Sequence, residues 1–180
     1  MKYLTVLSAI SISLALLTAC NQTSNNTANV KDSVSSDSTK VNLVTMKDDQ
    51  INSTYKSYTD LKNALVSANV KNAQKASLLL SETLTNIKGC GNTALIAKEI
   101  SNSTDIKEQR KSFIPLSSDL IALMKNAEVE KGELYVQYCP MANSGKGAFW
   151  MASTKAINNP YYGEEMLNCG ETKETITTTK

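Results

Sequence analysis

The spacing of apolar residues between Ile51 and Ala127 is the feature that most limits the folds open to this chain. These residues recur at steps of three and four, the spacing that places them on one face of an α-helix. The first stripe is Ile51, Tyr55, Tyr58, Leu61, Leu65 and Ala68, and the second is Ala73, Ala76, Leu80, Leu84 and Ile87. Helices with one apolar face bury it against each other, so the pattern predicts an antiparallel helical bundle with short connections.

Residues near the ends of these stripes predict where the helices begin and end. Asn69 and Asp105 each precede a stripe, and their side chains can accept a hydrogen bond from a free N–H of the first helical turn. Gly89-Cys90-Gly91 ends the second helix, since glycine is a poor helix former. We expect the last helix to bend or break locally at Pro115, which lacks a backbone N–H.

The pattern changes after Gly132 from helical to strand-like. Residues 134–138 are mostly apolar, with two tyrosines and a valine, and residues 148–151 can pair with them as a hairpin. The predicted fold class is therefore mostly α, an antiparallel helical bundle with a small C-terminal β-hairpin and loop lobe, together spanning residues 49–170. Residues 171–180 are polar and threonine-rich, and are predicted to form a frayed tail.

Residues 1–19 have the features of a secretory signal peptide. Lys2 precedes an apolar run from Val6 to Leu17 that is too short to span a membrane. The run ends in Leu17-Thr18-Ala19-Cys20, which resembles the lipobox of bacterial lipoproteins. That resemblance implies a lipid, such as palmitate, on Cys20, and a protein anchored to a membrane of the cell envelope that faces the periplasm or the exterior. Ordinary signal cleavage, with Cys20 free or in a disulfide, is the alternative.

Residues 20–48 follow as the acylated cysteine and a flexible tether. The segment is rich in Ser, Thr, Asn and Asp, and it has too few large apolar side chains to offset the entropy of ordering.

Composition excludes several function classes. The chain has no histidine, which removes imidazole bases, histidine-based triads and histidine-ligated metals. Its net charge of +2 lacks the basic excess of a nucleic-acid-binding domain. No other base is evident beside a cysteine nucleophile, so we expect no enzyme activity. The lysines on the helix faces are assigned to solvated surface.

The soft donors are 4 cysteines and 6 methionines, and four of these ten residues form two short pairs. Cys139 lies two residues before Met141, and Met166 lies three residues before Cys169. Thiolate and thioether sulfur favour Cu(I) over hard cations, so Cys139, Met141, Met166 and Cys169 are the candidate metal ligands. A turn at Asn159-Pro160 and Gly163 can bring the second pair back to the first.

Each of these residues also has a simpler interpretation. Cys139 and Cys169 can form a structural disulfide in an oxidising compartment, which would contribute about 3 kcal/mol. Met141 and Met166 can be core filler. Cys90 is interpreted as a buried or free thiol, unless its flanking glycines leave it exposed and reactive or let it pair between molecules.

Four ordered motifs resemble the signature of a bacterial envelope family, the domain-of-unknown-function family 3347. They are Tyr138-Cys139-Pro140-Met141-Ala142, Gly147-Ala148-Phe149-Trp150, Asn159-Pro160-Tyr161-Tyr162-Gly163 and Met166-Leu167-Asn168-Cys169-Gly170. The family occurs as lipoproteins and on adaptor subunits of copper and other heavy-metal efflux systems. The resemblance implies copper handling, with a heavy-metal efflux adaptor as partner. The alternative is a disulfide-stapled module without metal that docks on another envelope protein.

Overall fold

The computed structural model describes residues 43–178. Within this range the chain forms four α-helices: α1 (Asp49–Val66), α2 (Val70–Thr85), α3 (Gly91–Asn102) and α4 (Ile106–Lys125). The strands are β1 (Thr45–Met46), β2 (Val129–Lys131), β3 (Glu133–Cys139), β4 (Ala148–Ala152) and β5 (Glu171–Thr177), with a 3-10 helix, η1 (Gly163–Met166), between β4 and β5. The mostly α fold with a small C-terminal hairpin is confirmed.

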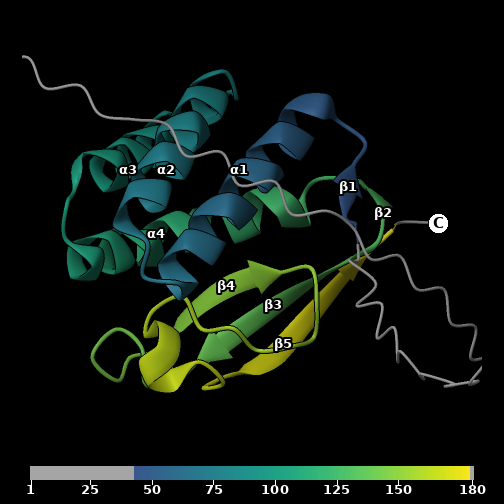
Figure 1. Cartoon of the computed structure of the whole chain (residues 1–180). Coiled ribbons are helices and arrows are strands. Elements are labelled where there is room, and N and C mark those ends of the chain that lie inside the picture. The colour runs from purple at the N-terminus through teal and green to yellow at the C-terminus, as the bar shows by residue number, and fades with distance from the viewer. Residues whose placement is uncertain (1–42, 179–180) are drawn as a thin grey trace, which may run out of the picture. The chain divides into compact units, whose positions relative to one another are not determined.

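The helices pack on one face of a small antiparallel sheet (Figure 1). Its strand order is β4-β3-β5, while β1 and β2 form a separate two-stranded pair. Helix α2 packs against both α1 and α3, and α4 packs against α3 and β4. None of the helices in residues 43–178 has the length and apolar character needed to cross a membrane.

Two of the helix starts follow the predicted capping residues. The Asn69 side-chain oxygen accepts a hydrogen bond from the N–H of Asn72 at 3.0 Å, and Asp105 accepts one from Lys107 at 2.8 Å. Each bond satisfies an N–H that the first turn of a helix leaves free. Both capping predictions are therefore confirmed.

Pro115 does not interrupt α4, which is continuous from Ile106 to Lys125. The expected local break is wrong. Phe113 and Leu116, on either side of the proline, are completely buried. We attribute the continuity to this packing, which outweighs the loss of one backbone hydrogen bond.

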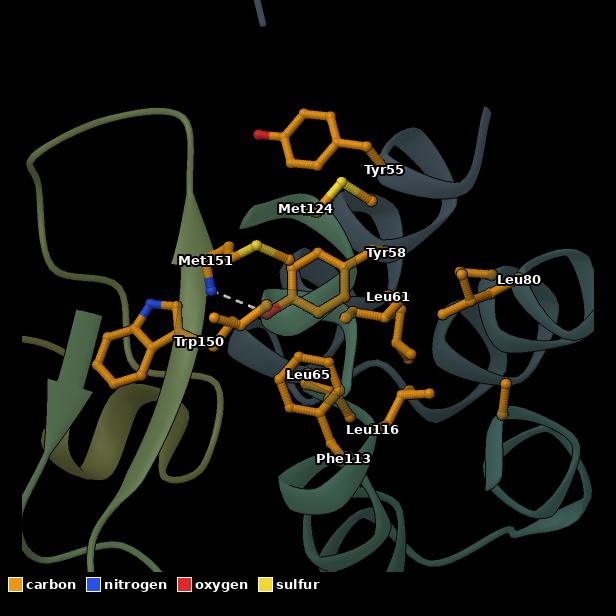
Figure 2. Packing of buried hydrophobic residues seen from close by; sticks show 14 of the residues in the cluster. Tyr55, Tyr58, Leu61, Leu65, Leu80, Phe113, Leu116, Met124, Trp150 and Met151 are labelled. Atoms are coloured by element: carbon orange, nitrogen blue, oxygen red, sulfur yellow. Dashed lines mark hydrogen bonds between the residues drawn. The ribbon is translucent and has the colours of Figure 1, made fainter. Parts of the chain in front are cut away.

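Tyr58 connects the helices to the sheet at the centre of the core. Its hydroxyl lies 2.8 Å from Ser117 Oγ of α4 and accepts a hydrogen bond from the Met151 N–H of β4 at 2.9 Å (Figure 2). Its ring stacks on Phe113 with the ring centres 5.4 Å apart. One side chain thus joins α1, α4 and β4, and it fixes where β4 lies against the bundle.

The folded domain extends beyond both of the boundaries predicted from the sequence. Strand β5 lies within the segment predicted to be a frayed tail, and it pairs along β3. That prediction is wrong, because the segment has threonines and Ile176, which favour strands, and β3 offers it a free edge. At the other end, Val44 and Met46 are buried, so the last residues assigned to the tether belong to the folded unit.

Lys62 on α1 does not follow the prediction that the lysines on the helix faces are solvated. Its side chain is only 7% exposed, and burial lowers its pKa from 10.5 to about 8. The unfolded chain therefore binds more protons than the folded one between about pH 8 and 10.5, so this group makes stability rise with pH in that window.

We expect Lys62→Met to raise the free energy of unfolding at pH 7 by about 1–3 kcal/mol, because it removes the cost of burying a charge. The gain should shrink as the pH rises from about 8 through 10.5, since Lys62 is neutral in both states only above 10.5. Urea denaturation at pH 7 and pH 10 measures this, with Lys98→Met on an exposed site of α3 as control. A gain that is equal at the two pH values would contradict the assignment.

Candidate functional site

Cys139 ends β3 and is placed by the hairpin. It pairs with Ala148 across the hairpin, and Gln137, two residues earlier, pairs with Trp150. Because side chains alternate along a strand, Cys139 and Gln137 share one face. Figure 2 shows Trp150 on the side of β4 away from the helices. The Cys139 side chain therefore belongs to the sheet face opposite the bundle, where it is completely buried.

Asn159 directs the segment after β4 back to this face. Its side-chain amide donates to the Cys169 carbonyl at 3.0 Å, and its side-chain oxygen accepts from the Tyr161 N–H at 2.8 Å. Its backbone N–H donates to the Leu167 carbonyl at 2.9 Å, and its carbonyl accepts from the Gly163 N–H at 3.0 Å. The turn predicted at Asn159-Pro160 and Gly163 is confirmed. Sequence reasoning missed the role of the Asn159 side chain, although asparagine often bonds to the backbone two residues on.

The two cysteines meet at this point. Cys139 Sγ and Cys169 Sγ lie 2.8 Å apart, although the residues are 30 positions apart in the sequence. Cys139 is fully buried and Cys169 is partly buried. Contact with the Cys139 sulfur, followed by burial, raises the pKa of the Cys169 thiol, and the backbone of Met141 opposes this shift. No S–S bond joins the two sulfurs in this structure.

The two predicted thioether ligands are at the surface. Met141 is 52% exposed and Met166 is 39% exposed. The other methionines in the described range, Met46, Met124 and Met151, are all buried. Met141 and Met166 are therefore not core filler. Each lies within three residues of a site cysteine, and the Cys169 N–H donates to the Met166 carbonyl at 3.0 Å.

No group of three or more Cys, Asp or Glu side chains arranged to hold a metal ion is found among residues 43–178. The site consists of two touching thiols with two solvent-exposed thioethers nearby in the chain. A soft ion is the cation that suits such donors.

Cys90 is not part of this site. Cys90 lies at the start of α3 in a different part of the fold. Burial, and then the carboxylate of Asp119, raise the pKa of its thiol, which opposes the reactive thiolate form. Cys20, the predicted lipidation site, lies outside the described residues.

Fold and site together define a helical-bundle domain with a small sheet that carries a pair of cysteines. The family model described as "Protein of unknown function (DUF3347)" matches residues 54–132, and this match supports the resemblance of the chain to that family. The match covers the bundle from α1 to the turn before β3, whereas Cys139 and Cys169 lie beyond it. No curated protein and no solved structure matches the chain.

Proposed function

We propose that this protein is a lipid-anchored protein of the bacterial envelope that binds Cu(I) through Cys139 and Cys169. The observation that supports this best is the approach of their sulfur atoms to 2.8 Å, with an exposed methionine within three residues of each cysteine. In this proposal, Cys20 carries the lipid, and the bound ion is sequestered or passed to a heavy-metal efflux adaptor.

The donors and their exposure fit a soft ion. Thiolates bind Cu(I) strongly, and thioethers are among the few neutral side chains that it accepts. Exposed methionine is uncommon, because its side chain is apolar and usually fills a core. Met141 and Met166, each within three residues of a site cysteine, are exposed, so an ion can reach their side chains from solvent.

Metal binding requires the two sulfurs to move apart. Metal–sulfur bonds are about 2.3 Å long, as for zinc, so an ion held between both thiolates needs a wider separation than 2.8 Å unless the angle at the metal is very acute. Cys169 is partly exposed and can change its side-chain rotamer, whereas Cys139 is fixed by complete burial. Since both thiols must lose their protons, we expect Cu(I) affinity to rise with pH.

A second candidate function follows from the same distance. Two sulfurs in contact are close to the geometry of a disulfide, so the pair can also be a staple in an oxidising compartment. The protein would then be a module without metal that docks on another envelope protein. Thiol counting on freshly secreted protein, with and without reductant, separates the two candidates: a fully blocked pair that binds no metal after reduction favours the staple.

The test of the copper proposal is an anaerobic Cu(I) titration of the reduced full chain in detergent against a competing chelator. We expect Cys139→Ser/Cys169→Ser to weaken binding by about a hundredfold or more, because both strong donors are lost. Cys90→Ser removes a thiol elsewhere in the fold and should leave the affinity unchanged. Met141→Leu/Met166→Leu should weaken binding to a smaller extent. An unaltered affinity in the double cysteine variant would exclude this site.

A further inference from the structure

A groove lies next to the cysteine pair, between α4 and the loop that joins β3 to β4. It encloses about 420 Å³, within the size range of ligand pockets of about 300–1,000 Å³. Lys107, Arg110 and Lys111 of α4 contribute to one wall, and Ala142, Tyr161 and Tyr162 to the other. The groove thus combines cationic and aromatic side chains.

The charge in this groove is unbalanced. Three cationic side chains line it, and Glu165 is the one carboxylate among the lining residues. Lys111 has an additional partner in Glu108, at 3.5 Å, but both side chains are largely exposed, so the pair is weak. Lys107 forms no ion pair within residues 43–178. An anionic group in the groove would therefore gain attraction that the protein itself does not satisfy.

Arg110 is held in position for such a group. Its Nη2 donates to the Leu65 carbonyl at 3.0 Å. A Cβ atom on Gly163 would lie 2.5 Å from the same Nη2, so only glycine leaves room for the guanidinium. Its Nε is buried and has no hydrogen-bond partner in the described part of the chain. A guanidinium held in position at the wall of the groove suits a carboxylate.

The groove is also connected to the candidate metal site. The Tyr162 hydroxyl donates to the Met141 carbonyl at 2.7 Å. Met141 follows Cys139 after a single proline, so Tyr162 holds the backbone of one candidate ligand. A molecule seated in the groove would lie beside this connection.

We propose that this groove binds an acidic peptide segment of a partner protein, with carboxylates against Lys107, Arg110 and Lys111 and apolar atoms against Tyr161 and Tyr162. The statement that this partner donates or accepts copper rests on the proposed function. The binding of the acidic segment to the groove does not depend on it. Charge complementarity gives such a contact its specificity and a rapid association.

The experiment measures fluorescence anisotropy of a fluorescein-labelled peptide, Asp-Glu-Tyr-Glu-Asp-Glu, with the reduced, copper-free full chain in detergent at low salt. We expect Lys107→Glu/Lys111→Glu to weaken peptide binding by about tenfold or more, since each reversal replaces an attraction by a repulsion. Lys88→Glu/Lys98→Glu makes the same change of net charge at exposed sites outside the groove, and should change binding by less than about twofold. Circular dichroism of both variants should match the parent.

Equal weakening by the two double variants would overturn the proposal, because net charge alone would then explain the binding. Displacement of the labelled peptide by inorganic phosphate at the same concentration as the peptide would also overturn the proposal, because the groove would then be a simple anion site. Copper titration of Lys107→Glu/Lys111→Glu separates this inference from the proposed function. The variant should keep its Cu(I) affinity, and the peptide should bind even if the cysteine pair holds no metal.

Discussion

Replacement of Phe113 by alanine is expected to lower the free energy of unfolding by about 3–5 kcal/mol, one of the largest effects of any single change in this chain. Phe113 is completely buried. Its ring stacks on Tyr58 at 5.4 Å and packs against Tyr161 at 5.8 Å, so it joins α4 both to α1 and to the segment that leads to Cys169. Urea denaturation followed by far-UV circular dichroism measures the change.

Phe149 provides the matched control, since it is the other phenylalanine of the chain. It is 40% exposed, and its ring packs against Tyr138 with the centres 4.5 Å apart. Phe149→Ala should cost about 1 kcal/mol, because less surface is buried and no cavity forms. Equal losses for the two variants would contradict the placement of Phe113 in the core.

Oxidation of the cysteine pair is expected to raise the free energy of unfolding by about 3–4 kcal/mol. A disulfide between Cys139 and Cys169, which are 30 positions apart, closes a loop in the unfolded chain. This loop lowers the conformational entropy of the unfolded state and so favours folding. The folded structure needs little rearrangement, because the sulfurs are already in contact. Denaturation of oxidised and reduced protein measures the difference.

Two variants show whether this pair is responsible. Cys139→Ser/Cys169→Ser should have the same stability with and without reductant, whereas Cys90→Ser should respond as the parent does. The oxidised protein should bind no Cu(I), because neither thiolate remains. A redox response that persists in the double variant would assign it to other cysteines.

The helical half of the fold can be predicted from the sequence because its signals are local. Asn69 and Asp105 cap helices through bonds to residues two or three positions away, and the apolar stripes need only the helical period. The approach of the two cysteines also followed from a local signal, the turn at Asn159-Pro160.

Features that depend on long-range contacts could not be predicted in this way. Strand β5 is exposed along nearly all its length and forms only because β3 offers it an edge. Lys62 is buried by the way α1 packs, which its neighbours in sequence do not indicate. The exposure of Met141 and Met166 could not be predicted from the sequence either, because methionine is found both in apolar cores and among metal ligands.

The copper K-edge X-ray absorption spectrum of the reduced full chain, loaded with one equivalent of Cu(I), tests most directly whether Cys139 and Cys169 together bind Cu(I). We predict a first shell made of sulfur alone, which is lost in Cys139→Ser/Cys169→Ser and kept in Cys90→Ser. A first shell of nitrogen or oxygen, or the same sulfur shell in the double cysteine variant, would contradict the claim.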